Sequence, residues 1–324
     1  MEYAFQAEGL VRRFGRTTAL DGVDLAAREG TVLGVLGPNG AGKTTAVRIL
    51  ATLLRPDAGR ATVGGLDVVR DAAGVRRMIG LTGQYASVDE DLTGLENLVL
   101  IGQLLDLPKA GAKVRAAELL ERFGLSDAAG RRALTYSGGM RRRLDLAASL
   151  VGRPGVIFLD EPTTGLDPAR REDLWRVIRS LTGEGVTVLL TTQYLEEADA
   201  LADELSVIDH GKVIAHGTPD ELKRVVGSQT IEVRPKNPEQ IEEAATIVRL
   251  VTGREPVLRG RTMLTAPVDG DAMFAEAVRR LQGARIGVVE ISLRLPSLDE
   301  VFFSLTGQHT DQHQLDEGLE EGAP

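Results

Sequence analysis

The stretch that decides the fold of this chain has the pattern G-x-x-x-x-G-K-[ST] and reads Gly37-Pro38-Asn39-Gly40-Ala41-Gly42-Lys43-Thr44. An apolar run, residues 31–36, precedes it, and an amphipathic run, residues 47–54, follows it. We therefore expect a strand, a tight glycine turn and a helix, in that order. Such a turn points successive main-chain N–H groups at one anion, and the positive end of the helix dipole adds to the attraction. The pattern predicts a phosphate-binding loop, called here the phosphate loop.

The side chains at the end of the phosphate loop have specific roles in this prediction. Lys43 is expected to reach the β- and γ-phosphates of a nucleotide, and the hydroxyl of Thr44 is expected to ligate Mg²⁺. Thr45 is counted with the loop among the residues that contact ATP. The alternative is a glycine turn without a ligand, which the flanking strand and helix disfavour.

Length and composition restrict the classes of protein to consider. The chain has 324 residues, 43% hydrophobic and 26% charged, which suits a globular protein with one large and one smaller domain. Its apolar runs are shorter than the roughly 18 to 20 residues of a membrane span, and residues 1–6 do not resemble a secretory signal, so a cytoplasmic protein is expected. A net charge of −9 argues against nucleic acid as a partner.

A pair of carboxylates follows a second apolar run. Residues 156–159 read as a buried strand, and Asp160 and Glu161 come directly after it. Successive strand residues point to opposite faces, so different roles are expected. Asp160 is predicted to hold Mg²⁺ through water, and Glu161 to polarise the attacking water. Without the phosphate loop, a helix cap or a solvated pair would be the simpler interpretation.

Two glutamines also follow strand-like runs. Gln84 comes after residues 79–83, and its amide oxygen could ligate Mg²⁺. Gln193 comes after residues 186–192, at a strand end that would meet the γ-phosphate. Either glutamine alone would be an unremarkable surface residue.

Phe14 lies between arginines, in the segment Arg12-Arg13-Phe14-Gly15-Arg16. Its ring could stack on adenine, because every base has a π-face. A single phenylalanine is more often part of the core, and the residues alone favour that alternative.

The segment Ser137-Gly138-Gly139 is expected to start a helix, with Ser137 as the N-cap. A helix N-terminus of this form is a second anion site. One nucleotide cannot readily occupy both sites if they lie on different subdomains, so we expect this segment to serve the nucleotide of another subunit. The alternative is an ordinary capped helix on which residues 141–143 form a solvated face.

Strands that alternate with helices predict an α/β fold with a mostly parallel sheet. Residues 4–36 read as short strands separated by turns, and about 86–150 as a helical subdomain that contains a capping box at Thr93 and Glu96. Domains are expected at 1–225, for nucleotide binding, and at 226–306, a small α+β domain. The acidic segment 307–324 is expected to be disordered, which makes metal binding by His309 and His313 there a weak hypothesis.

Taken together, residues 4–225 resemble the ATP-binding subunit of an ABC transporter. The resemblance rests on five motifs in the right order: the phosphate loop, Gln84, Ser137-Gly138-Gly139, Asp160-Glu161, and the turn that ends at Asp167. It implies a P-loop fold with an antiparallel β subdomain and a helical subdomain that carries Ser137-Gly138-Gly139, here called the signature segment. It also implies ATP and Mg²⁺ as cofactors, Phe14 as the adenine-stacking residue, and a homodimer on ATP binding in which Asp167 contacts the facing subunit.

The segments 84–90, 136–145 and 191–195 look like the daunorubicin-resistance branch of antibiotic exporters. In that branch the permease is a separate polypeptide, so the resemblance implies an ATPase on the inner face of the membrane that powers drug export. The chain departs from the wider family at three positions: Tyr136 and Met140 replace the usual leucine and glutamine, and Gln193 replaces the switch histidine. Glutamine cannot shuttle a proton, so we expect slow but persistent hydrolysis.

A different class of function stays open. A soluble, ATP-switched protein could sequester a drug or regulate without pumping, with the C-terminal domain as its ligand site. DNA-repair and translation-factor members of the family form a third class. The acidic charge and the single phosphate loop speak against that class.

Overall fold

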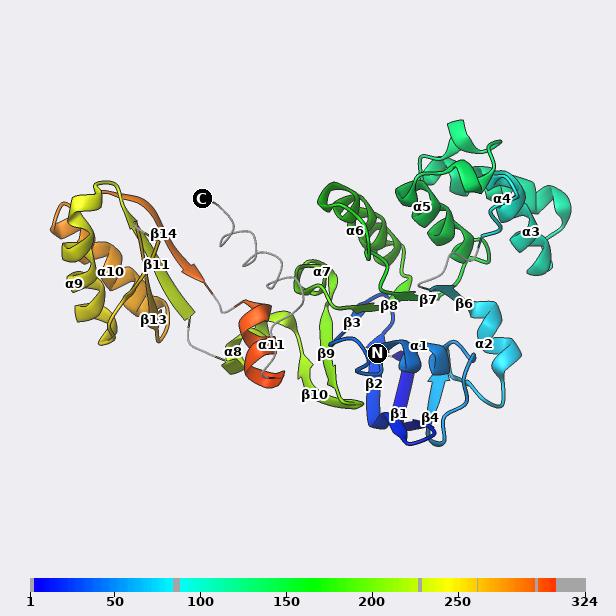
Figure 1. Ribbon diagram of the computed structural model, residues 1–324, viewed down its shortest axis with the longest axis horizontal. Helices are drawn as coiled ribbons and strands as arrows, with labels where there is room; N and C mark the ends of the chain where they lie inside the picture. The colour runs from blue at the N-terminus through cyan, green and yellow to red at the C-terminus, as the bar shows by residue number, and fades with distance from the viewer. Residues whose placement is uncertain (1–2, 84–87, 227–228, 261, 295–296, 307–324) are drawn as a thin grey trace. The chain divides into compact units, whose positions relative to one another are not determined.

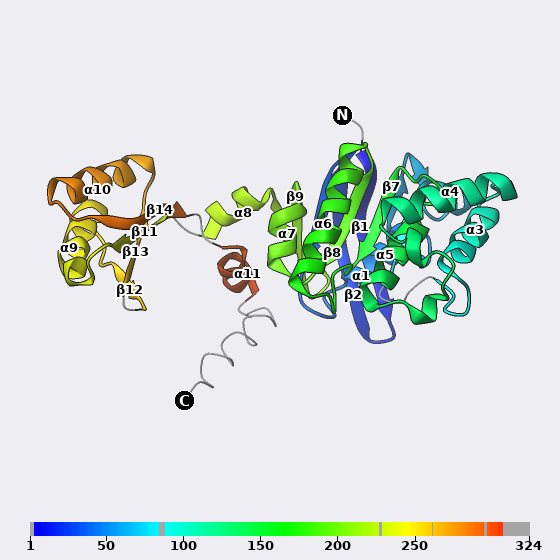
Figure 2. The ribbon, with the colours of Figure 1, turned by 90° about the horizontal axis from the view of Figure 1, so that it is seen from above.

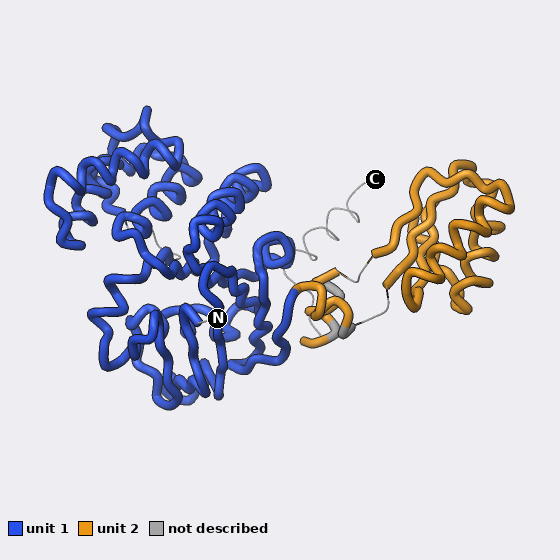
Figure 3. Tube along the Cα trace, turned by 180° about the vertical axis from the view of Figure 1, so that it is seen from behind, with its two compact units in different colours: residues 1–218 blue, residues 219–324 orange. Residues whose placement is uncertain are grey.

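The computed structural model describes residues 3–83, 88–226, 229–260, 262–294 and 297–306 (Figure 1). Contacts divide the chain into two compact units, residues 1–218 and 219–324 (Figure 3). The sequence places the domain boundary at residue 225, whereas the first compact unit ends at residue 218. Helix α8 (Pro219–Val226) is counted with the second unit because it packs against α11 (Leu298–Thr306). Among the described residues, no helix is long and apolar enough to cross a lipid bilayer.

The first sheet is antiparallel and has the strand order β2-β1-β4-β5. Its strands are β1 (Tyr3–Phe14), β2 (Thr17–Arg28), β4 (Ala58–Val63) and β5 (Leu66–Asp67). The expectation of short strands over residues 4–36 is wrong, because β1 and β2 each run for 12 residues. Gly9, with φ +59°, lies where the β1–β2 register shifts, so this glycine makes a bulge within the strand instead of ending it.

The central sheet has the order β10-β9-β3-β8-β7-β6 and is parallel except for β10. Its strands are β3 (Val32–Leu36), β6 (Ile79–Thr82), β7 (Val156–Asp160), β8 (Thr187–Thr192), β9 (Glu204–Asp209) and β10 (Lys212–Gly217). The hairpin between β9 and β10 turns at His210 and Gly211, both with positive φ.

The central sheet is buried on both faces, which is why its strands read as continuous apolar runs. On β7, Val156 and Phe158 face the core that the antiparallel sheet and α1 (Lys43–Leu50) share with the central sheet. Ile157 and Leu159 face the opposite core, which is formed with the helices of the helical subdomain and with α6 (Pro168–Gly183). This layering confirms the α/β fold class with a mostly parallel core.

The helical subdomain contains α3 (Gly94–Leu104), α4 (Lys109–Arg122) and α5 (Gly138–Ser149), with the 3₁₀ turns η1 (Ser126–Ala128) and η2 (Ala133–Thr135) between α4 and α5. Figure 2 shows its three α-helices gathered beside β7. The capping box is present: the Thr93 hydroxyl accepts from the main-chain N–H of Glu96 at 3.1 Å, and the Glu96 carboxylate accepts from that of Thr93 at 2.8 Å. The remaining helices of the first unit are α2 (Ala72–Met78), α6 (Pro168–Gly183) and α7 (Leu195–Leu201).

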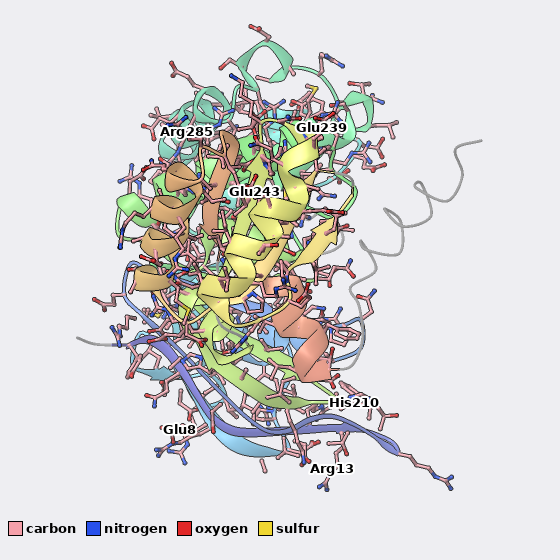
Figure 4. All side chains as sticks on the ribbon, turned by 90° about the vertical axis from the view of Figure 1, so that its left-hand side faces the viewer. Glu8, Arg13, His210, Glu239, Glu243 and Arg285 are labelled. Carbon is pink, nitrogen blue, oxygen red and sulfur yellow. The ribbon has the colours of Figure 1, made fainter. Side chains whose placement is uncertain are left out.

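The second unit contains an antiparallel sheet with the order β12-β13-β11-β14. Its elements follow in the order β11 (Gln229–Pro235), η3 (Pro238–Gln240), α9 (Ile241–Thr252), β12 (Val257–Arg259), β13 (Met263–Val268), α10 (Asp271–Gly283) and β14 (Val288–Arg294). This β-α-β-β-α-β order with central β11 and β13 is the ferredoxin-like arrangement. Glu239 of η3 and Glu243 of α9 are exposed (Figure 4).

Candidate active site

The phosphate loop connects β3 to α1 at the carboxyl end of the central sheet, and α1 begins at Lys43. Space requires glycine at positions 37 and 42, and a positive φ favours it at positions 40 and 42. A Cβ at Gly37 would lie 2.2 Å from the main-chain oxygen of Ile208, and one at Gly42, with φ +114°, 2.5 Å from that of Ala19. The loop is therefore packed against two neighbouring segments and holds its shape.

Lys43 is 4% exposed and is directed back at its own loop. Its ammonium donates to the main-chain oxygens of Gly37 at 2.7 Å and Pro38 at 3.1 Å, and lies 3.3 Å from Oε1 of Glu161. Burial lowers the pKa of Lys43, and the charges of Glu161 and Asp160 oppose that shift. The structure therefore joins the predicted phosphate-binding lysine to one of the two predicted carboxylates.

Asp160 is the last residue of β7 and accepts two hydroxyl hydrogen bonds on its Oδ1 atom. Thr44 donates one at 3.1 Å, and Thr191 of β8 donates the other at 2.6 Å. A hydroxyl and a carboxylate side by side are the oxygen donors that Mg²⁺ prefers, so these residues fit the predicted metal.

Glu161 does not continue the strand, because its backbone is left-handed with φ +49°. The prediction that the two carboxylates point to opposite faces of one strand is therefore wrong in its geometry. The turn at Glu161 brings its carboxylate to Lys43, while Asp160 meets Thr44. Thr164 also donates to Glu161 Oε2, at 3.4 Å. The two carboxylates still have different partners, which agrees with different roles.

A cavity of about 180 Å³ opens at the phosphate loop. It is lined by Ala19, residues 39–45 and Glu161. Thr45 is part of this lining. Among the described residues that line it, none belongs to the signature segment.

Phe14 ends β1 and is 47% exposed, so the alternative that it is a core residue is wrong. The guanidinium of Arg12 lies 4.9 Å from the centre of its ring. Asp57 holds Arg12 in place through an ion pair of 2.8 Å. One side of the ring is thus occupied by a cation, and an aromatic ring in that setting remains available for stacking on a base.

Ser137 is the N-cap of α5, as the sequence predicts, and its hydroxyl accepts from the N–H of Met140 at 3.3 Å. Ser137 and Gly138 are exposed. A Cβ at Gly139 would lie 2.9 Å from Cδ of Arg170, so a side chain at that position would require the Arg170 side chain to move. The signature segment thus presents an uncovered helix N-terminus.

Asp167, Gln193 and Gln84 complete the list of predicted residues. Asp167 is the N-cap of α6 and accepts from the N–H of Arg170 at 2.9 Å, so it has a structural role whether or not it meets another subunit. Gln193 directly follows β8 and is half-buried. Gln84 lies outside the described residues, as do His309 and His313.

Sequence reasoning missed Glu197, which is fully buried in α7. Burial raises the pKa of Glu197 to about 7, although hydrogen bonds, one of them donated by Thr163 at 3.1 Å, oppose the shift. Its neighbour Glu196 is exposed. Nothing in the sequence Glu196-Glu197 distinguishes the two, so the signal for a buried carboxyl was absent.

The fold and this site define a P-loop nucleotide-binding protein, because the phosphate loop follows β3 and two carboxylates lie near it at the carboxyl end of β7. Residues 20–164 match the ABC transporter family. The chain is 54% identical, over 97% of its length and 98% of the relative's, to the daunorubicin resistance ATP-binding protein DrrA2 of Streptomyces coeruleorubidus. It is 38% identical, over 93% of both chains, to the Nod factor export ATP-binding protein I of Ralstonia nicotianae. The chain belongs to the ABC transporter family and is one of its ATP-binding subunits.

Solved structures agree with this assignment. An ATP-binding cassette of an ABC transporter in its ADP conformation has a TM-score of 0.62 at 28% identity, over 68% of this chain and 93% of that one. A dimeric cassette in a post-hydrolysis state, bound to ADP and phosphate, has a TM-score of 0.61 at 25% identity, over 66% of this chain and 98% of that one. The resemblance to the daunorubicin-resistance branch is confirmed, and the chain is an ATPase.

Proposed function

We propose that this chain powers a separate membrane permease that exports an antibiotic or another hydrophobic drug. The proposal rests on two contacts at the phosphate loop, the ion pair of Lys43 with Glu161 and the hydrogen bond of Thr44 to Asp160. The chain that makes them is similar over nearly its whole length to a drug-resistance ATP-binding protein. Bound to the permease, the chain acts in the cytoplasm, on the inner face of the membrane.

In the proposed mechanism the main-chain N–H groups of the phosphate loop and the ammonium of Lys43 hold the phosphates. Thr44 would hold Mg²⁺ directly and Asp160 would hold it through water, with Gln84 as a further ligand, and the ion would neutralise phosphate charge. Glu161 orients the attacking water and accepts its proton. Gln193 donates a hydrogen bond to the γ-phosphate without carrying a proton, which makes hydrolysis slow.

The same proposal makes ATP the link between two copies of the chain. The cavity at the phosphate loop is lined by one part of the chain, and the exposed signature segment lies on another. A second copy placed head-to-tail would bring its Ser137 to the phosphates and its Asp167 to the interface. Adenine would stack on Phe14. The dimeric cassette bound to ADP and phosphate is a protein of the same fold and supports this arrangement.

Transport in vesicles tests the proposal. The chain and its candidate permease are co-expressed, and inside-out vesicles are given a fluorescent anthracycline with and without ATP. We expect ATP-dependent accumulation that is lost in Glu161→Gln and kept in Glu172→Gln, which changes an exposed carboxylate of α6. Binding of the drug by the purified chain, with no transport by the vesicles, would contradict export and favour sequestration.

A further inference from the structure

Arg142 lies in α5, the helix that begins at the signature segment, and its side chain is only 17% exposed. The interpretation of residues 141–143 as a solvated face is therefore wrong at this position. The guanidinium donates to three main-chain oxygens on two other segments. Nη1 reaches Gly83 at 2.8 Å. Nε reaches Pro162 at 2.8 Å, and Nη2 reaches Glu161 at 3.2 Å.

These contacts hold a strained piece of backbone. Glu161 has φ +49°, a strained conformation for a residue with a side chain, which persists only where its surroundings impose it. Its N–H is held from β8, because it donates to the main-chain oxygen of Thr191 at 3.1 Å. Its carbonyl, and that of Pro162, are held by Arg142 of α5. The direction of the Glu161 carboxylate follows from both attachments.

Arg142 is itself oriented by its own helix. Asp145 lies one turn further along α5, is 1% exposed, and has Oδ2 at 3.6 Å from Nη1 of Arg142. A planar guanidinium with donors in a fixed fork can span several carbonyls at once, which the single ammonium of lysine cannot do. The orientation of α5 therefore determines where the carbonyls of Glu161 and Pro162 are held.

We propose that Arg142 is a positioning residue for hydrolysis, which couples the orientation of the signature helix α5 to the carboxylate of Glu161 in the same chain. The inference rests on the proposed role of Glu161 in activating water. In the proposed dimer the Ser137 end of α5 meets the phosphates bound by the other copy. Arg142 then transmits that engagement to the water-activating group of its own chain, so that each copy's carboxylate responds to the ATP held by its partner.

The test compares Arg142→Gln and Arg142→Lys with a control, Arg143→Gln, in the purified full chain. Arg143 is the adjacent residue of α5 and donates to the carbonyl of Phe123 at 3.0 Å, away from the site. We expect kcat to fall roughly 10- to 100-fold in both Arg142 variants, because misplacing a reacting group by about 1 Å has effects of that size. The Kd for a fluorescent ATP analogue should stay within about threefold, and Arg143→Gln should keep kcat within about twofold. If Arg142→Gln does not fold, Arg142→Lys carries the test.

A double variant separates positioning from a general structural effect. If Arg142 acts through Glu161, Glu161→Gln combined with Arg142→Lys will hydrolyse ATP no more slowly than Glu161→Gln alone. A double variant slower by the full factor of the single Arg142 variant would overturn the proposal, as would an Arg142 variant with the kcat of Arg143→Gln. Full hydrolysis by Glu161→Gln would instead remove the proposed role of Glu161, a failure distinguishable from the others.

Discussion

Glu161 is the residue on which the proposed chemistry depends most, because its carboxylate lies 3.3 Å from the Lys43 ammonium and accepts from the Thr164 hydroxyl. The sequence pattern of a buried strand followed by two acids places it beside the phosphate loop. The left-handed backbone that brings its carboxylate within 3.3 Å of the Lys43 ammonium depends on Thr191 and Arg142, which are distant in sequence. Contacts to main-chain oxygens leave no pattern of residue types, and for that reason Arg142 escaped sequence reasoning.

Replacing Glu161 with glutamine should stop turnover, with kcat lowered roughly 10²- to 10⁴-fold, because the amide cannot accept the proton of the attacking water. ATP should still bind, since the phosphate loop is intact. The measurement is phosphate release under saturating ATP, with Glu172→Gln as the control. An unchanged rate would show that another group activates the water.

Replacing Gln193 with histidine should preserve or raise kcat, because imidazole both donates a hydrogen bond and carries a proton near neutral pH. Gln193 is half-buried and directly follows β8, so the imidazole of the variant would lie at the strand end that is expected to meet the γ-phosphate. Steady-state hydrolysis between pH 6 and 8 is the measurement. A large fall in kcat with unchanged ATP affinity would count against the idea of a slow switch.

Glu197 should make stability depend on pH. Its pKa is raised from 4.5 to about 7 by burial, so the folded chain binds more protons than the unfolded chain between these values. The free energy of unfolding should therefore fall as pH rises from about 4.5 to about 7, by about 3 kcal/mol in total.

Urea unfolding of Glu197→Gln measures this effect at pH 5, 6, 7 and 8. Glutamine keeps an acceptor for Thr163 and carries no charge, so the variant should lose that pH slope and exceed the parent chain in stability at pH 8. Glu196→Gln, at an exposed position of the same helix, should keep the slope. If the free energy of unfolding of Glu197→Gln still fell with pH, other groups would be responsible for that dependence.

Among the elements, the turn before α5 shows what a departure from the family's pattern does. Tyr136 is buried and donates through its hydroxyl to the carbonyl of Ala128 at 2.7 Å, which ties η1 to the start of the signature helix. Gly94, at the start of α3, leaves room for this hydroxyl, because a Cβ there would lie 2.3 Å from it. Tyrosine in place of leucine thus adds a fixed point within the helical subdomain.

Tyr136→Phe should lower the free energy of unfolding by about 1 to 2 kcal/mol, because it leaves the carbonyl of Ala128 without this donor. ATP affinity should not change, since the ring and the signature segment remain. Thermal unfolding measures the loss, and Tyr3→Phe, which changes an exposed tyrosine, is the control. Equal stability of the two variants would mean that the Tyr136 hydroxyl contributes no more to the free energy of unfolding than the exposed hydroxyl of Tyr3.

The sequence predicts which kinds of secondary structure occur better than it predicts which strands pair. The α+β character of the second unit was expected from the sequence and is found. The ferredoxin-like order β12-β13-β11-β14 was not predicted, because it is set by antiparallel pairing between strands distant in the chain. Strand length in the first sheet was also misjudged, since short strands were expected and β1 and β2 instead continue through Gly9 and Gly22, which both have positive φ.

At the scale of the whole molecule, the account depends on two copies sharing each nucleotide. The phosphate loop provides one anion site. The exposed N-terminus of α5 provides a second anion site, which does not line the cavity at the phosphate loop. Arg142 connects that helix to Glu161, so dimerisation and hydrolysis would be coupled through main-chain contacts. The central claim is therefore geometric: Ser137-Gly138 of one copy must face the phosphate loop of the other.

Cysteine cross-linking tests this claim most directly, because the chain contains no cysteine. Two Glu161→Gln chains with different tags are mixed, one with Asn39→Cys in the phosphate loop and one with Gly138→Cys, at a glycine with open space around a Cβ. We predict a disulfide between the two tags that forms with MgATP and not without it. A mixture that stays monomeric with MgATP, or that cross-links equally without nucleotide, would contradict the account.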